Sequence, residues 1–483
     1  MTFSNGAANI LVTLVLLGWP LVVFAMFLML RARTAALWSL LVGFLFLPEG
    51  AFLFAGLPEY TKQSATGLAV LLAALILDGG KPLRIRLRSI DLAIVMWCFG
   101  RIATSVSNGL GVYDGFSQLF LELSRWGIPY WVGRAYFSDS EGLRELARGI
   151  VIGGLLYVPL CLWEVRFSPQ LHTKLYGFLA TPFYMVLRYD GYRPMVFMQT
   201  SLMVAMWMST ATVLCAWLGI SGAVKRIAGV PTVWWIVPLF VTTLLCKAMG
   251  AVTLMIVGIG VLLVARIAGT ALPLVIVATL AGAYPVLRYS GLMSNERILS
   301  AASVVYDDER LESLGIRLAS EELFIDHSRE RALLGWGGWG RNMVYLEDGQ
   351  RSVPDGLWVI ALSSAGWLAL GSLAAMFLAP VVQLLRRFRA PRWPRADTAP
   401  FAGMAVLVLL YWVDCLSNAM VNSVLVAAIA GTNGWFATPP KRVAAVSAPV
   451  SAAPAEVAPR GESRPVKLGL GRGLSNRRRG PPT

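Results

Sequence analysis

Long apolar runs separated by short charged segments constrain this chain more than any other feature. A hydrocarbon core about 30 Å thick requires about 20 apolar residues per spanning helix. Thirteen runs of suitable length are residues 10–30, 35–57, 65–80, 90–106, 116–137, 149–164, 196–217, 229–246, 248–265, 267–287, 355–378, 399–416 and 419–437. The sequence therefore predicts an all-α, polytopic integral membrane protein with about 12–13 transmembrane helices in residues 1–437.

The amino-acid composition supports a membrane protein and argues against a soluble nucleic-acid-binding protein. Of the 483 residues, 57% are hydrophobic and 14% are charged, whereas soluble domains carry roughly 25% charged residues. The 42 basic and 27 acidic residues give a net charge of +15, which in a soluble protein would suggest a nucleic-acid partner. Here the charges are sparse and lie between apolar runs, so we expect the partner to be the lipid bilayer and not nucleic acid.

The positions of the basic residues predict the orientation of the chain. Short loops rich in Lys and Arg lie on the cytoplasmic side of membranes. The basic loops follow the odd-numbered runs and contain Arg31, Arg33, Lys81, Arg84, Arg86, Arg88, Arg144, Arg148, Lys225, Arg226, Arg266, Arg386, Arg387, Arg389, Arg392 and Arg395. This parity predicts that these loops are cytoplasmic and that the N-terminus is outside. It also favours keeping 116–137 as a span, although that run contains charged residues. Residues 438–483 lack apolar periodicity, and we expect a disordered basic cytoplasmic tail.

Two long loops fall on the predicted outer side, at about 164–194 and at 288–354. The second contains eleven acidic residues, eight arginines and no lysine. The planar guanidinium group suits bidentate binding of phosphate or carboxylate. Two interpretations remain open for each arginine, because Arg–Glu pairs could equally hold the loop together.

Within this loop, apolar residues of the segment 306–331 recur at mostly three- and four-residue intervals, which predicts an amphipathic helix. Arg317 and Glu321 are four residues apart and share a face of that helix. They could form a salt bridge, or Glu321 could be a carboxylate held near a reacting centre. A neutral imidazole at His327 could take a proton from a hydroxyl group, or the residue could be incidental.

The segment GWGGWGRN follows at residues 335–342. Its glycines allow close backbone approach, and the rings of Trp336 and Trp339 could stack on sugars or mark the membrane interface. Arg341 and Asp355 then place charges where the next span begins. Further ionisable residues lie in or beside spans, where such groups usually face a cavity or a partner. They are Arg101, Arg125, Arg134, Glu164 and Lys247, most of them expected toward the outer half.

Given these sequence segments, the chain resembles the bacterial O-antigen ligase and polymerase superfamily, especially its exopolysaccharide-polymerase branch. The strongest matches are SLGIRLASEELF, RALLGWGGWGRN and SVPDGLWVIALSSAGWLAL. Weaker matches upstream are GIPYWVGRAYF, LCLWEVRFSPQLHTKLYG and GYRPMVFM. Ligases of the family carry a histidine at the mouth of the helix after the loop. Here Asp355–Gly356 occupies that place, while Gly366 keeps the family spacing and Ala369 stands at the closing position.

The resemblance implies a C-type glycosyltransferase-like fold in the bacterial cytoplasmic (inner) membrane. The implied activity is metal-independent transfer or polymerisation of glycan repeats from an undecaprenyl-type polyprenyl diphosphate on the outer face, with no cofactor. Other polysaccharide assembly and export proteins would be partners. For the diphosphate we predict Arg317, Arg331 and Arg341, then Arg134 and Arg193. For the base we predict Glu321 or Asp355, then His327. An O-antigen-type ligase, a transporter or flippase-type carrier of lipid-linked sugars, and a non-catalytic assembly subunit remain alternatives.

Overall fold

The computed structural model describes residues 2–4, 8–54, 58–188, 190–304, 308–338, 340–345 and 352–437. The predicted tail, 438–483, and the predicted sugar-stacking residue Trp339 lie outside these ranges. The described chain is mostly helical, and the helices surround one extensive core of buried apolar side chains.

Each of the thirteen apolar runs contains a helix. These helices are α1 (Ile10–Met29), α2 (Ala32–Phe46), α3 (Lys62–Leu77), α4 (Leu92–Ser107), α5 (Gly111–Glu122) with α6 (Ile128–Tyr136), α7 (Ser140–Phe167), α9 (Ser201–Ile220), α10 (Ile236–Leu245), α11 (Met249–Ile267), α12 (Leu272–Tyr289), α15 (Leu357–Arg387), α16 (Ala399–Cys415) and α17 (Ser423–Ala437). Helix α8 (Leu171–Tyr176) lies in the shorter loop, and α13 (Asn295–Ala302) and α14 (Asp308–Arg329) lie in the longer one.

These helices differ in whether they are long and apolar enough to cross a membrane. Seven helical stretches of the described chain are long and apolar enough to cross a membrane: Ile10–Met29, Ser89–Ser107, Ser140–Phe167, Ser201–Ile220, Met249–Ile267, Leu272–Tyr289 and Leu357–Arg387. Four further apolar helices are shorter, at Ala32–Phe46, Lys62–Leu77, Thr232–Leu245 and Ala399–Cys415. Capping residues fix where several of these helices begin. For example, the Thr61 hydroxyl accepts the backbone N–H of Ser64 and so fixes the start of α3.

A few short strands accompany the helices of this mostly helical chain, which is consistent with the predicted all-α class. Strands β1 (Thr2–Phe3), β2 (Ala51–Leu53) and β3 (Tyr60–Thr61) form one antiparallel sheet. Two hairpins pair β4 (Leu187–Arg188) with β5 (Gly191–Tyr192), and β6 (Arg226–Ile227) with β7 (Val230–Pro231). Strand β1 precedes α1, and the other strands occupy connections between helices, where two- or three-residue ladders satisfy backbone groups that no helix satisfies.

The run 116–137, which carries charged residues, is one continuous helical stretch in the structure. Helix α5 passes into α6 through a π-helical segment, η3 (Leu123–Gly127). Near its start, Asp114 accepts a hydrogen bond from Ser105 at the end of α4 (2.8 Å). Near its finish, Arg134 contacts Asp91, just before the start of α4. The stretch therefore returns along the full length of its neighbour, α4.

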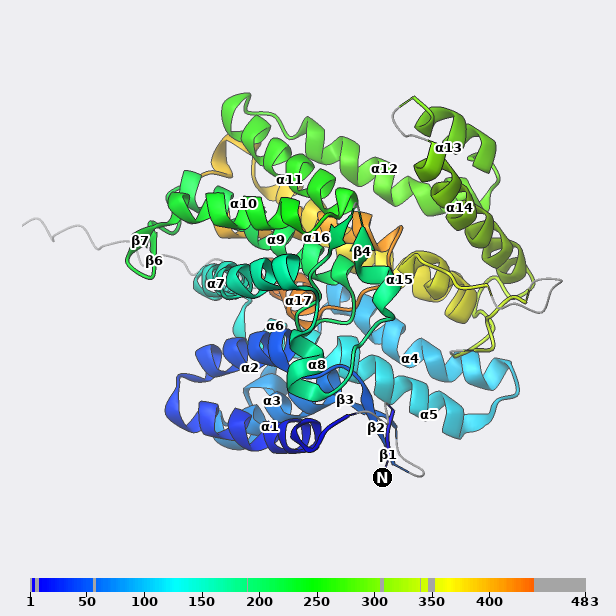
Figure 1. The fold of residues 1–483 in the computed structure, drawn as a ribbon, viewed down its shortest axis with the longest axis horizontal. Coiled ribbons are helices and arrows are strands. Elements are labelled where there is room, and N and C mark those ends of the chain that lie inside the picture. Colours follow the sequence, from blue (N-terminus) through cyan, green and yellow to red (C-terminus); the bar gives the residue numbers. More distant parts are fainter. Residues whose placement is uncertain are drawn as a thin grey trace, which may run out of the picture. The chain divides into compact units, whose positions relative to one another are not determined.

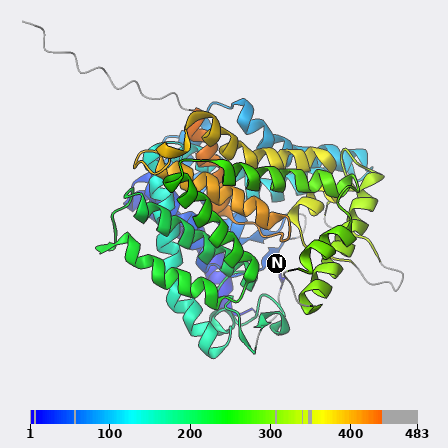
Figure 2. The ribbon, with the colours of Figure 1, turned by 90° about the horizontal axis from the view of Figure 1, so that it is seen from above.

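The basic loops gather at one end of the helices, as the parity of their positions predicts. Residues of four of these loops line one cavity, Arg144 donates to Ala396 of a fifth (2.8 Å), and Arg266 donates to Ile220 at the end of α9. We call this the basic end; hairpin β6–β7 marks it at the left of Figure 1. The long loop, with α13 and α14, lies on the right beside the turn between α4 and α5. We call that the loop end, and Figure 2 shows α13 and α14 together there in yellow-green.

Three helices form the centre of the bundle. Almost every residue of α9 and α16 is buried, and α17 packs against α6 and α16. A helix that is apolar on all sides is buried on all sides, and α9 and α16 have little amphipathic character. These central helices hold the peripheral pairs α4–α5 and α12–α15, which carry the loop end.

Candidate functional site

The long loop is folded around helix α14, which confirms the predicted helix at 306–331. The side chains of Leu318, Phe324 and Ile325 are buried, and the helix packs against α15 and α13. Not every predicted apolar contact is made, because Ile316 and Leu323 are exposed. One side of α14 thus faces the protein, and this side brings its carboxylates toward α12.

Glu321, a predicted base, belongs to a buried cluster between α12 and α14. Arg288 Nε donates to Glu321 Oε1 at 2.6 Å, and the Tyr284 hydroxyl donates to the same carboxylate at 3.0 Å. Arg288 is 4% exposed and also donates to the carbonyl of Met293 and the side chain of Asn295. Burial raises the pKa of Glu321, while the hydrogen bonds from Arg288 and Tyr284 act in the opposite direction. Both oxygens of this carboxylate are occupied, so it fastens α14 to α12.

The predicted partner of Glu321 pairs elsewhere. Arg317 Nε lies 3.3 Å from Asp355 Oδ2, just before the first turn of α15. The side chains of Arg317 and Asp355 are 47% and 49% exposed. The sequence predicts Arg317 as a diphosphate ligand and Asp355 as a base, and the structure places these two side chains in contact. They form an accessible cation and an accessible carboxylate in direct contact.

His327, Arg331 and Trp336 form a second group at the end of α14. The imidazole of His327 stacks on the indole of Trp336, with ring centroids 4.5 Å apart and an interplanar angle of 3°. The indole N–H donates to the His327 carbonyl (2.9 Å), and the Arg331 guanidinium lies 4.7 Å from the indole centroid. His327 Nε2 is buried and has no hydrogen-bond partner in the described chain. The rings of His327 and Trp336 and the guanidinium group of Arg331 therefore already contact one another.

Helix α15 is broken beside this group. Ala365 and Gly366 have non-helical backbone angles, and Gly366 has φ +67° and ψ −164°. The backbone N–H groups of Trp336 and Gly337 donate to the carbonyls of Ser363 and Ser364, at 2.9 Å each. In return, the N–H groups of residues 367 and 368 donate to the carbonyls of residues 332 and 333 (2.8 and 3.2 Å). We call residues 332–337, which fill the break, the insert.

Close approach explains the glycines at this contact. A Cβ atom added to Gly366 would lie 2.3 Å from the backbone of Leu333, and one added to Gly335 would lie 2.4 Å from the backbone of Ala365. Gly335 also has φ +65°. The insert therefore takes over the backbone hydrogen bonds that the break leaves open, and only glycine fits at either position.

A line of polar contacts connects the loop to α4 and α5. Arg341 Nη1 lies 2.8 Å from Asp114 Oδ1, and Asn342 donates to Ser363 Oγ (2.9 Å). Next to Ser363, Ser364 accepts a hydrogen bond from Arg101 Nη1 (2.9 Å). Arg341, another predicted diphosphate ligand, is 43% exposed and paired with a carboxylate.

These polar contacts end at a buried ion pair between α4 and α5. Arg101 is 8% exposed and lies 3.1 Å from Glu122 of α5, which also accepts the indole N–H of Trp97 (2.8 Å). Arg101 Nε and Asn342 Oδ1 are buried without a partner among the described residues. Arg101 thus has the partner expected of an ionisable residue in a span, although sequence reasoning did not select it for the site.

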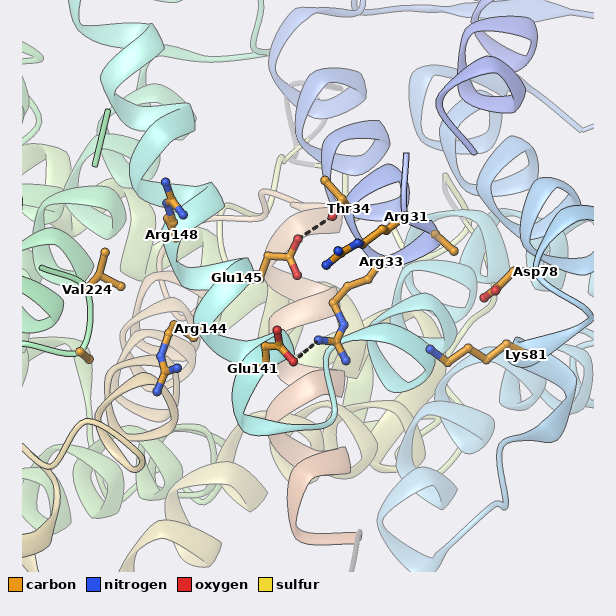
Figure 3. A pocket seen from close by; sticks show the side chains of 12 residues that line it. Arg31, Arg33, Thr34, Asp78, Lys81, Glu141, Arg144, Glu145, Arg148 and Val224 are labelled. Atoms are coloured by element: carbon orange, nitrogen blue, oxygen red, sulfur yellow. Dashed lines mark hydrogen bonds and ion pairs between the residues drawn. The ribbon is translucent and has the colours of Figure 1, made fainter. Parts of the chain in front are cut away.

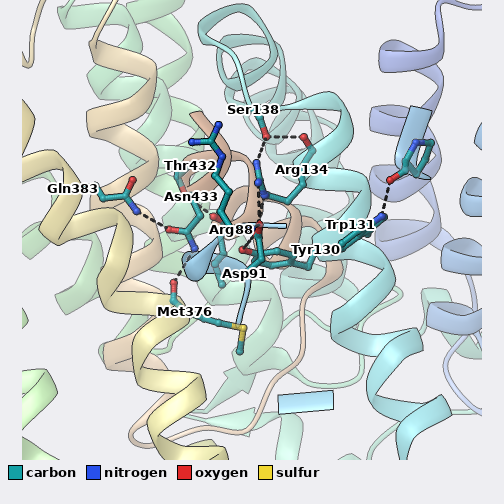
Figure 4. A network of polar contacts seen from close by, with 12 residues as sticks. Arg88, Asp91, Tyr130, Trp131, Arg134, Ser138, Met376, Gln383, Thr432 and Asn433 are labelled. Carbon is teal, nitrogen blue, oxygen red and sulfur yellow. Dashed lines mark hydrogen bonds and ion pairs between the residues drawn. The ribbon is translucent and has the colours of Figure 1, made fainter. Parts of the chain in front are cut away.

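Arg134, a second-choice diphosphate ligand, is not part of this assembly. Its guanidinium binds the Asp91 carboxylate through two bonds of 2.8 and 3.0 Å, and Tyr130 donates to the same carboxylate (Figure 4). Asp91 is fully buried and follows the basic loop that contains Lys81. The pair therefore lies toward the basic end, where it joins α6 to the start of α4.

Arg193, the other second choice, lies in the shorter loop. It directly follows β5 and precedes Met195 and Val196, whose backbone N–H groups donate to Glu164 Oε2 at 2.8 and 2.7 Å. Glu164 is 1% exposed and also accepts the N–H of Leu171. This carboxylate at the end of α7 organises the shorter loop, so the position of Arg193 is fixed by its neighbours and not by α14.

Comparison with known proteins adds no family assignment. No protein-family model and no curated protein sequence matches this chain.

The candidate site is therefore defined by geometry alone. It comprises the accessible pair Arg317–Asp355, the buried cluster Arg288–Glu321–Tyr284 behind it, and the insert with its stacked Trp336. Sequence reasoning missed Arg288 and Tyr284 as members, although Arg288 was one of the eight loop arginines. Chemically, the site can bind an anion at the exposed guanidinium and accept a proton at the exposed carboxylate.

Proposed function

We propose that this chain is a membrane glycosyltransferase that polymerises or transfers glycan repeats carried on a polyprenyl diphosphate. The observation that carries the proposal is the half-exposed pair of Arg317 and Asp355, 3.3 Å apart at the mouth of α15. A lipid diphosphate leaving group requires a cation at the membrane surface, and an acceptor sugar requires a base within reach. Both groups are present here, and both are accessible.

The proposed reaction assigns one role to each member of the pair. The hydroxyl oxygen of the acceptor sugar forms a bond to the anomeric carbon of the donor. The bond from that carbon to the diphosphate oxygen breaks, and its electron pair leaves with the diphosphate. Arg317 stabilises the negative charge that develops there, and Asp355 accepts the hydroxyl proton. The two side chains separate as the diphosphate replaces Asp355 at the guanidinium.

The surrounding contacts support these roles. The buried Arg288–Glu321 pair fastens α14 to α12, so Arg317 is presented from a helix held in place by its neighbours. At the other end of α14, His327 and Arg331 pack against the ring of Trp336 and so help to hold the insert beside α15. Arg341, paired with Asp114, extends the basic surface toward α5.

The finer topology belongs to the same proposal. We place thirteen spans in the cytoplasmic membrane of a bacterium, with the basic end in the cytoplasm and the loop end outside. The positive-inside rule and the gathering of the basic loops at one end support this orientation, and the resemblance to the O-antigen ligase and polymerase superfamily suggests the C-type glycosyltransferase-like fold. A lipid-linked donor would then reach the pair from the outer leaflet.

A second candidate is a carrier that moves lipid-linked sugars across the membrane. Interrupted helices that face polar groups are typical of transporters. Helix α15 is interrupted at Ala365–Gly366, next to the buried pair of Arg101 and Glu122. For a carrier these groups, and not Arg317 and Asp355, would contact the substrate.

Lipid-linked glycans from cells that lack the gene distinguish these functions. Single repeats on the carrier lipid at the outer surface indicate a lost polymerase, and long chains there indicate a lost ligase. Repeats confined to the cytoplasmic leaflet indicate a lost carrier, and they would overturn the transferase proposal. Unchanged lipid-linked glycans would overturn both proposals.

Point variants then test the pair itself. We expect Arg317→Gln and Asp355→Asn to restore no polymer growth at normal protein levels. Arg329→Gln is the matched control, because Arg329 lies on the same helix in a similarly exposed ion pair with Asp326 (3.5 Å). Normal product chains in both Arg317→Gln and Asp355→Asn would refute the assignment of the site.

A further inference from the structure

A cavity of about 750 Å³ opens at the basic end, opposite the proposed active site. Its walls come from four places in the sequence: the turn between α1 and α2, the end of α3, the first turns of α7, and the connection after α9. Figure 3 shows Arg144 and Arg148 of α7 on one side and Asp78 and Lys81 on the other, with Arg31 and Arg33 between them. Five basic and three acidic side chains line it, a net charge of +2.

The acidic side chains of the cavity already have partners. Glu141 lies 3.5 Å from Arg33, which also binds Asp139 at 2.5 Å. Glu145 accepts a hydrogen bond from Thr34 (2.8 Å). Asp78 likewise accepts the hydroxyl of Tyr136 (2.8 Å). Glu145 and Asp78 keep their negative charge beside neutral hydroxyl groups, and the five basic residues still leave the lining with a net charge of +2.

Three arginines in the lining keep unused donors. The guanidinium groups of Arg31 and Arg148 have no hydrogen-bond or ion-pair partner among the described residues. Arg144 donates from Nη2 to the Ala396 carbonyl (2.8 Å), but its Nε is buried and has no partner in the described chain. The exposed guanidinium groups of Arg31 and Arg148 are therefore available to an anion in the cavity.

We propose that this cavity binds a phosphate-bearing anion through Arg31, Arg144 and Arg148. A guanidinium group can donate two parallel hydrogen bonds to phosphate oxygens, and Arg31, just before α2, lines the cavity together with Arg144 and Arg148 of α7. The volume falls in the roughly 300–1,000 Å³ range of small-molecule sites, which favours an organic phosphate or a lipid headgroup over a simple inorganic ion. The positive-inside rule requires basic residues at this end, but exposed loops would satisfy it without a cavity.

The lining of the cavity shares no residue with the proposed active site. Arg144 and Glu164 lie twenty residues apart on α7, which corresponds to about 30 Å along a helix. Glu164 organises the shorter loop at its own end of that helix. The proposal therefore does not depend on the transferase reaction, and its test needs no donor glycan.

The first arm of the test uses inorganic pyrophosphate as the probe. The purified full chain is placed in nanodiscs of neutral phosphatidylcholine, and thermal unfolding is followed by tryptophan fluorescence. We expect a saturable rise in the unfolding temperature. Arg148→Gln should weaken the response about tenfold or more, as expected for the loss of a charge-assisted bond. Arg148 is exposed and has no described partner, so this variant should fold normally.

The matched control is Arg86→Gln, which removes the same charge from an exposed arginine at the same end but outside the cavity. It should respond as the wild type does. An equal loss in Arg148→Gln and Arg86→Gln would overturn the proposal, because it would show general attraction to a basic surface.

The second arm distinguishes the sources of the phosphate. Nanodiscs containing phosphatidylglycerol replace the neutral ones, and bound lipid is measured by native mass spectrometry. Retained phosphatidylglycerol that Arg148→Gln loses and Arg86→Gln keeps identifies a lipid headgroup. A response to pyrophosphate alone identifies a soluble ligand. No response to either probe overturns the proposal.

Discussion

Replacing Gly366 by alanine tests whether the insert and the break in α15 depend on each other. Gly366 has φ +67° and ψ −164°, a region that is essentially restricted to glycine. An alanine there costs about 1–3 kcal/mol in backbone strain. Its Cβ would also lie 2.3 Å from the Leu333 backbone, so the insert must move away.

The magnitude follows from the contacts that are lost. Four backbone hydrogen bonds of 2.8–3.2 Å join the insert to residues 363–368, and each contributes about 1 kcal/mol net. Together with the strain, Gly366→Ala should lower the free energy of unfolding by about 5–7 kcal/mol. Gly371→Ala is the control, because Gly371 belongs to the same helix and has nothing within 4 Å of an added Cβ. It should be neutral or up to about 1 kcal/mol more stable.

Two measurements check this prediction in mixed micelles. Unfolding by sodium dodecyl sulfate, followed by tryptophan fluorescence, gives the change in stability. Hydrogen exchange gives its location, because the N–H groups of residues 336, 337, 367 and 368 should be protected in the wild type and lose protection in Gly366→Ala. If those four amides exchange in Gly366→Ala as slowly as in the wild type, the reasoning is refuted, whatever the change in stability.

Three further predictions concern other contacts. Asp91→Asn leaves the buried guanidinium of Arg134 without its counter-charge and should lower the free energy of unfolding by about 3–5 kcal/mol. Arg317→Gln removes a half-exposed ion pair and should lower it by less than about 1 kcal/mol. Equal losses of stability in the same unfolding assay would contradict the burial of the Arg134–Asp91 pair. Burial lowers the pKa of His172 from 6.5, so the folded state binds fewer protons than the unfolded state and stability should fall as the pH is lowered through 6.5. His172→Gln should reduce that dependence between pH 7.5 and 5.5, and an unchanged slope would exclude His172 as its source. Tyr284→Phe removes one donor to a buried carboxylate and should cost about 1 kcal/mol, measurable by the same unfolding.

Local pattern was enough to predict the helices and the basic end. Apolar runs of bilayer length and the parity of the basic loops are properties of short segments, and the structure has a helix in every predicted run. The helix α14 was predictable for the same reason, since its apolar spacing repeats within three turns.

Pairing between distant residues was not predictable from spacing. Helical periodicity suggested Arg317 as the neighbour of Glu321, yet Glu321 pairs with Arg288 on α12 and Arg317 pairs with Asp355. A one-dimensional pattern gives neighbours on the same helix, whereas the partner on another helix is set by how the two helices pack. The same holds for Arg134, whose partner Asp91 lies 43 residues earlier.

The break in α15 was hidden by its own composition. Residues 355–378 are an unbroken apolar run, and Gly366 is a helix-compatible residue in that setting. What opens the helix is the insert, which precedes it by some thirty residues and supplies both donors and acceptors. A sequence pattern within one segment gives no information about backbone hydrogen bonds that join it to a distant segment.

The reciprocal bonds between the insert and α15 also impose an order on biosynthesis. The insert is synthesised before α15, but its partners include the N–H groups of residues 367 and 368. It therefore stays without those partners until the helix has been made and placed beside it. Insertion of the spans and completion of the loop end are consequently separate events, and the second depends on the first. A chain stopped before residue 368 could hold most of its helices and still lack the closure on which the loop end depends.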